Sequence, residues 1–238
     1  MMKARDIMTT NVVTVTENTS VPVIARLLIE KRISGVPVVD RQNGVVGIVT
    51  ESDLLRRPEL GTDRRRKHWL ELFVPNAQLA SEYIQSHGQM AGDVMTHDVI
   101  RVAPDAPIGT IVDIFESERI NHLPVVENGR LVGIVSRGNL VQALGSISNQ
   151  ISPVSIDDRR IRDLVIAEFA RHPWGLDSEN NVIVTGGIVY LWGVAPGPEV
   201  RKALRVAAGG IPGVRGVQDR MTSTRGDWPL RFHQDPAG

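Results

Sequence analysis

The sequence predicts a mixed α/β fold in which two copies of a small β-α-β-β-α unit are followed by a smaller α-β-β-α-β unit. Three observations lead to this prediction. A nine-residue phrase occurs twice, apolar residues in each copy change from helical to strand spacing, and a separate helix and hairpin pattern begins near residue 155.

The internal repeat is defined by three phrases that recur in the same order. Asp6 and Asp93 are 87 residues apart, as are Pro37 and Pro124, so the repeated unit is a small domain that occurs twice. The paired phrases are DIMTTNVVTV (6–15) with DVMTHDVIRV (93–102), ISGVPVVD (33–40) with INHLPVVE (120–127), and VGIVTESDL (46–54) with VGIVSRGNL (132–140).

Each copy contains the same predicted elements. Residues 12–15 and 99–102 are β-rich, and a helix is expected after each because apolar residues then recur at i, i+3, i+4 and i+7. These helical residues are Val21, Ile24, Ala25 and Leu28 in the first copy and Ile108, Ile111, Val112 and Phe115 in the second. Two strands follow in each copy, around an Asn-Gly pair that favours a hairpin turn, and a second helix ends the unit.

Composition excludes several function classes. Lys plus Arg and Asp plus Glu both number 27, so no overall attraction to nucleic acid is expected. The absence of cysteine excludes disulfides, thiolate metal sites and a cysteine nucleophile. Histidines lack metal-ligand spacing, so no metal site is expected. No signal peptide or membrane-spanning run is recognised, which predicts a soluble, cytoplasmic protein.

The repeated VGIV strand ends at a hydroxyl in both copies. Thr50 and Ser136 stand where each strand stops, and Asp53 and Asn139 fall in the first turn of the next helix. Such residues can cap the helix N-terminus, as in an [ST]-x-x-[DE] capping box. They are also well placed to bind the hydroxyl groups of a ribose. The residues alone leave both interpretations open.

Both copies resemble CBS domains, which are regulatory modules that occur in tandem pairs. The resemblance is carried by D-x-M-T, by [GH]-x-P-V-V-[DE] and by V-G-I-V-[TS]-x-x-[DN]-L, and covers roughly residues 1–146. It implies CBS repeats at 1–57 and 91–146, separated by a partly helical insert at 58–90. It also implies that the pair binds an adenine nucleotide between its repeats and associates as a homodimer.

The resemblance assigns candidate ligand-binding residues. Ribose is expected at Thr50 with Asp53 and at Ser136 with Asn139, and phosphate near Gly35 and His122. The adenine is expected near Val36 and Leu123, with Thr19 and Ile24 as further candidates. Arg137 is either a phosphate contact or a solvated side chain at the start of a helix. The glycines at 47 and 133 are expected to permit close backbone approach.

The change from Asp53 to Asn139 predicts unequal sites. A carboxylate accepts hydrogen bonds from ribose more strongly than an amide does, by about 1 to 2 kcal/mol. The first site is therefore expected to bind strongly, and the second weakly or not at all.

The insert and the C-terminal region carry different patterns. A basic run at 64–67 reads as a solvated face, and Trp69 with its apolar neighbours predicts a short packed helix. Residues 153–223 resemble a BON domain through a V-x-x-x-G-x-V-x-L-x-G-x-V hairpin and the sequence GVRGV. Ser155 and Asp158 predict a capping box, and Gly186-Gly187 predicts a turn. After this turn, alternation places Ile188, Tyr190 and Trp192 on one face of a strand, with Trp192 expected in the core, and residues 224–238 form a polar tail.

The leading functional hypothesis is a non-catalytic sensor. Its CBS pair would bind an adenine compound (AMP, ADP, ATP, NAD(H), S-adenosylmethionine or a cyclic dinucleotide) as a regulatory ligand, and its BON domain would contact an unidentified protein or lipid partner. The alternative is a scaffold with non-functional nucleotide clefts. An enzyme is not expected, because the sequence contains no HExxH, P-loop or nucleophile elbow.

Overall fold

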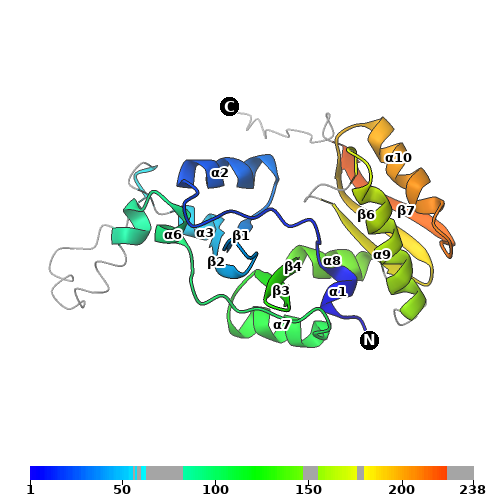
Figure 1. The fold of residues 1–238 in the computed structure, drawn as a ribbon, viewed down its shortest axis with the longest axis horizontal. Coiled ribbons are helices and arrows are strands. Elements are labelled where there is room, and N and C mark those ends of the chain that lie inside the picture. The colour runs from blue at the N-terminus through cyan, green and yellow to red at the C-terminus, as the bar shows by residue number, and fades with distance from the viewer. Residues whose placement is uncertain (56, 58–59, 63–82, 147–154, 176–179, 224–238) are drawn as a thin grey trace, which may run out of the picture. The chain divides into compact units, whose positions relative to one another are not determined.

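The computed structural model describes residues 1–55, 57, 60–62, 83–146, 155–175 and 180–223. These residues form two compact units, Met1–Leu144 and Gly145–Gly238 (Figure 1). The basic run at 64–67 and the helix predicted around Trp69 lie outside the described residues, as does the tail.

The first unit holds both copies of the repeat. The first copy contains α1 (Ala4–Ile7), α2 (Val21–Glu30), β1 (Gly35–Val39), β2 (Val45–Thr50) and α3 (Glu51–Leu54). The second contains α6 (Ala91–Val94), α7 (Ile108–Ser117), β3 (His122–Glu127), β4 (Arg130–Ser136) and α8 (Arg137–Ser146). The strands predicted at 12–15 and 99–102 are each reduced to a single parallel bridge, Val15 with Val38 and Val102 with Val125.

The two hairpins turn differently although both contain Asn-Gly. Asn128 and Gly129 both have positive φ, 51° and 77°, as a two-residue type I′ turn requires. The first hairpin instead uses a longer loop at 40–44, in which Asp40 Oδ1 accepts hydrogen bonds from the amides of Gln42 and Gly44 at 2.8 Å. The Asp40 carboxylate therefore binds loop amides that do not pair with the opposite strand.

The two copies exchange their D-x-M-T segments. Met95, from the second copy, packs over Gly47, where a Cβ would lie 2.3 Å from its sulfur, and Met8 packs over Gly133 in the same way at 2.5 Å. The backbones of Thr96 and Ile48 exchange hydrogen bonds of 2.9 and 3.0 Å, and Thr9 pairs likewise with Ile134. The close approach expected at these glycines is therefore made by a methionine from the other copy.

This exchange gives the first copy a core that includes residues of the second copy. One cluster of buried residues joins α2, the first hairpin and the segment that begins at α6. Its buried members are Val15, Val21, Ile24, Leu28, Val36, Val38, Val49, Ala91, Val94 and Met95. The spacing predicted for α2 is confirmed for Val21, Ile24 and Leu28, since all three side chains are buried.

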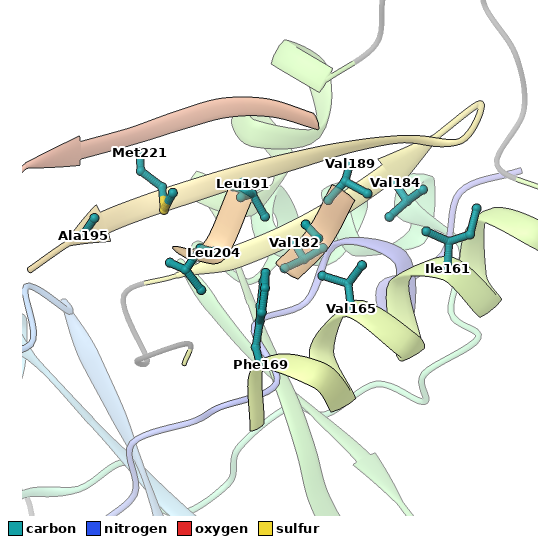
Figure 2. Close-up of a cluster of buried hydrophobic side chains, with 11 residues drawn as sticks. Ile161, Val165, Phe169, Val182, Val184, Val189, Leu191, Ala195, Leu204 and Met221 are labelled. Carbon is teal, nitrogen blue, oxygen red and sulfur yellow. The ribbon is translucent and has the colours of Figure 1, made fainter. Parts of the chain in front are cut away.

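The second unit is a small α-β-β-α-β fold, as predicted. It contains α9 (Ile156–Ala170), β5 (Asn181–Thr185), β6 (Ile188–Ala195), α10 (Pro198–Gly209) and β7 (Gly216–Ser223), and its sheet has the order β5-β6-β7. Figure 2 shows Ile161, Val165 and Phe169 of α9 pointing toward Val182 and Val184 of β5 and Val189 of β6. This cluster is the core of the unit.

Two local predictions for this unit have different outcomes. The capping box is confirmed, because the Ser155 amide donates to Asp158 Oδ2 at 2.9 Å and the Asp158 amide donates to Ser155 Oγ at 3.0 Å. The inward face predicted for β6 was wrong. The residues in the core are Val189 and Leu191, while Trp192 is partly exposed and outside the cluster. Tyr190 is also buried, so alternation in this strand does not separate buried from exposed residues.

Candidate functional site

The first strand-to-helix junction presents a carboxylate that is only partly used. Asp53 Oδ2 accepts hydrogen bonds from the Thr50 amide at 2.7 Å and from the Thr50 hydroxyl at 2.8 Å. Among the described residues, Oδ1 accepts none, and the side chain is partly exposed. Asp53 therefore caps the helix start and still has an oxygen available for a ligand hydroxyl.

The second junction has the same backbone geometry but different chemistry. Asn139 Oδ1 accepts from the Ser136 amide at 2.7 Å and the Ser136 hydroxyl at 2.9 Å. Its Nδ2 lies 3.3 Å from Thr9 Oγ1 and 3.4 Å from Gln142 Oε1. With 4% of its surface exposed, Asn139 is a buried link between α8 and the exchanged N-terminal segment.

The counterpart of Thr9 makes no such link. Thr96 occupies the equivalent position beside the first junction, but it is exposed and no hydrogen bond joins it to Asp53 among the described residues. The first junction is thus more open than the second. The difference arises because Asn139 has an amide nitrogen that reaches Thr9, whereas Asp53 has no such donor.

The two residues predicted to lie near phosphate meet each other. Gly35 pairs with Thr50 and His122 pairs with Ser136, so they are equivalent positions. The His122 ring lies against Gly35, because a Cβ added at Gly35 would be 3.2 Å from Cε1 of His122. The same Cβ would be 3.3 Å from the Thr50 methyl group. Ser34 Oγ is 2.9 Å from His122 Nε2. Burial lowers the pKa of His122, which favours the neutral imidazole.

The candidate adenine residues are divided between core and surface. Val36, Leu123 and Ile24 have no exposed area, so none of them offers a surface to a base in this conformation. Thr19 is partly exposed, and its hydroxyl accepts a hydrogen bond from the Thr16 amide at 3.1 Å. Thr19 also accepts at its carbonyl from Ala91, where the two copies meet.

Arg137 acts locally in this structure. Its Nη2 donates to the Phe115 carbonyl at 3.0 Å, near the C-terminal end of α7. The rest of the side chain is exposed. Within the described ranges no group of three or more His, Asp or Glu side chains could hold a metal ion.

Comparison with known proteins identifies the architecture. Residues 4–59 and 91–146 match the CBS domain family, and residues 157–225 match the BON domain family. The Methanocaldococcus jannaschii protein MJ1426 is 32% identical over 155 residues, which cover 60% of this chain and 92% of that protein. This chain belongs to the CBS domain family. A BON domain follows its CBS pair.

Two plant relatives match part of this chain. The chloroplastic CBSX1 of Arabidopsis thaliana is 31% identical over 131 residues, covering 52% of this chain and 56% of that protein. A crystal structure of CBSX2 in complex with AMP matches with 29% identity and a TM-score of 0.55, covering 63% of this chain and all of that chain. The α/β fold of the CBS pair is therefore shared with an AMP-bound protein.

No helix in the described ranges has the length and apolar content to cross a membrane.

Sequence reasoning found the junctions of the CBS pair but missed what lies beside them. The Thr9–Asn139 link and the Ser34–His122 contact join residues 130 and 88 positions apart. The available signal was the repeat itself. Asparagine replaces aspartate and histidine replaces glycine in the same copy, and each change adds a hydrogen-bonding group that reaches the other copy.

Proposed function

We propose that the CBS pair binds an adenine nucleotide at the Thr50–Asp53 junction, in a non-catalytic regulatory role, and that the BON domain relays the bound state to a partner. The observation that carries the proposal is the Asp53 carboxylate, which keeps one oxygen free at a partly exposed junction. The AMP complex of CBSX2, a protein similar over the whole CBS pair, supports the choice of ligand.

Ribose recognition follows from the chemistry of this junction. A carboxylate is an acceptor only, and the vicinal hydroxyls of a ribose are two donors with a fixed spacing. Oδ2 is oriented by the two Thr50 donors at 2.7 and 2.8 Å, so the carboxylate is held in place before a ligand arrives. Charge-assisted hydrogen bonds are about twice as strong as neutral ones, which makes Asp53 the main determinant of affinity.

The second junction is proposed to contribute little. Asn139 is buried, and its amide hydrogens point at Thr9 and Gln142. A ribose would have to displace these contacts and would find a neutral acceptor already shared by two donors. One nucleotide per chain is therefore the expected stoichiometry.

We propose a homodimer formed through the CBS pair and a cytoplasmic location. Large apolar side chains on its helices support association, since Ile29 of α2 is 77% exposed, and Val141 and Leu144 of α8 are 69% and 71% exposed. A ligand can shift such an assembly only if it binds its states with different affinity. The nucleotide would therefore act by changing how the two subunits of the dimer pack.

Calorimetric titration with AMP and with ATP tests this proposal. Saturable binding is expected for the natural chain, and Asp53→Ala should abolish it while the far-ultraviolet circular dichroism stays unchanged. Asp113→Ala is the matched control, because it removes an exposed carboxylate from α7 and should leave binding intact. Unchanged binding by Asp53→Ala would refute the assigned site.

A scaffold with closed clefts is the second candidate. It is favoured by the His122 ring, which occupies the space over Gly35 beside Thr50, and by the buried Asn139. In that case no adenine compound produces heat in the titration, and the apolar helix faces carry the function alone.

A further inference from the structure

The BON domain carries an apolar surface groove, two of whose lining residues, Trp174 and Ala207, also pack against the core. The groove has a volume of about 490 Å³ and lies between α10 and the segment that follows α9. It is lined by His172, Trp174, Glu199, Lys202, Ala203, Val206 and Ala207. Val206 is 67% exposed, whereas Leu204 and Ala208 on the other side of α10 are buried.

One wall of the groove is a fixed aromatic pair. The rings of His172 and Trp174 stack with centroids 4.3 Å apart and an interplanar angle of 8°. Glu168 holds the imidazole, with its Oε1 3.2 Å from His172 Nε2. A flat aromatic wall opposite Ala203 and Val206 suits an extended segment with large apolar side chains. Glu199 and Lys202 add one charge of each sign to the lining.

The chain itself supplies such a segment. The BON family match ends at residue 225, and DWPLRF follows at 227–232, with three large apolar residues in an otherwise polar tail. Asp227 precedes these residues and Arg231 lies between Leu230 and Phe232, so the segment carries one charge of each sign and can complement Lys202 and Glu199.

The described chain ends at the same end of the domain as the groove. Ser223 pairs with Ala195 in the parallel β6–β7 ladder, and α10 begins three residues after Ala195, at Pro198. Glu199 is therefore within roughly 20 Å of Ser223 along the backbone path, while five extended residues span about 17 Å and ten about 34 Å. The segment can reach the groove.

We propose that residues 228–232 of the same chain bind in this groove, with Trp228, Leu230 or Phe232 against Val206 and the His172–Trp174 pair. This inference is independent of nucleotide binding, so failure of either one leaves the other standing.

Disulfide cross-linking in the full chain tests it, because the chain has no natural cysteine. The variant Val206→Cys/Leu230→Cys is oxidised, and the linked peptide is measured by mass spectrometry, with non-reducing electrophoresis to separate intramolecular from intermolecular products. The control is Leu164→Cys/Leu230→Cys, which places the partner cysteine on an exposed position of α9 outside the groove. An intramolecular link at Val206 that forms about tenfold faster than the control link is expected.

Two results would overturn the proposal. Equal rates for the two pairs would mean that the tail samples the surface without preference. A predominantly intermolecular link would mean that the groove accepts a second copy instead.

In a second test, Val206→Glu should speed tryptic cleavage after Arg231 several-fold relative to Leu164→Glu, and equal cleavage would also contradict docking.

Discussion

Gly47→Ala tests the exchange of D-x-M-T segments between the CBS repeats. An added Cβ would lie 2.3 Å from Met95 Sδ, 2.8 Å from Met95 Cγ and 3.1 Å from the Thr96 carbonyl oxygen. Non-bonded heavy atoms prefer about 3.5 Å or more, so the sulfur would have to retreat by about 1.2 Å. Met95 is 6% exposed and next to Thr96, which is hydrogen-bonded to Ile48 in both directions, so it has little room to move.

The expected cost and its reversal follow from this packing. Overpacking of a well-filled site costs about 1 to 3 kcal/mol, and Met95→Ala alone should cost about 2 to 5 kcal/mol because it leaves a cavity. In the double variant the new methyl group occupies part of that cavity. The double variant should therefore be more stable than the sum of the two single effects predicts, by about 1 to 3 kcal/mol.

Urea unfolding of the four chains measures this coupling. Gly133→Ala with Met8→Ala provides an independent copy of the experiment, since Met8 Sδ is 2.5 Å from the equivalent Cβ position. Additive effects in both cycles would refute the exchanged packing.

Three further predictions concern single residues. Thr185→Val should stabilise the BON domain by about 1 kcal/mol in urea unfolding, because the buried Thr185 hydroxyl has no hydrogen-bond partner among the described residues; a loss of stability would contradict this. Burial lowers the pKa of His122 from 6.5, so the unfolded chain binds more protons and stability should fall as pH drops below about 6.5. His122→Gln should reduce the difference between unfolding midpoints at pH 7.5 and 5.5, and an unchanged difference would assign the pH dependence elsewhere. Leu144→Glu should convert the proposed dimer to monomer in sedimentation velocity, whereas a variant that remains dimeric would exclude the α8 face.

Much of the fold could be predicted because the repeat supplies each pattern twice. The spacing of Val21, Ile24 and Leu28 reports a helix with one buried face, and Asn128-Gly129 fixes the turn of one hairpin. Alternation failed in β6, where Tyr190 is buried as well as Val189 and Leu191. A strand that is covered on both faces has no polar side to reveal its orientation.

Only those contacts of the candidate site that join residues close in the sequence could be predicted. The Thr50–Asp53 and Ser136–Asn139 contacts span three residues, and both follow from a strand that stops before a helix. The contacts that make the sites unequal are not local, because Thr9 meets Asn139 across 130 positions. No periodicity within one copy encodes which copy its first segment will pack against.

The decisive measurement is the affinity of AMP for Asp53→Asn beside that of the natural chain. This change keeps the side-chain shape and the acceptor for Thr50, and removes the negative charge that distinguishes the first junction from the second. Isothermal titration should give one AMP per natural chain and an affinity about 5- to 30-fold lower for Asp53→Asn, which corresponds to about 1 to 2 kcal/mol. Equal affinities would contradict the conclusion that the Asp53 carboxylate binds the nucleotide.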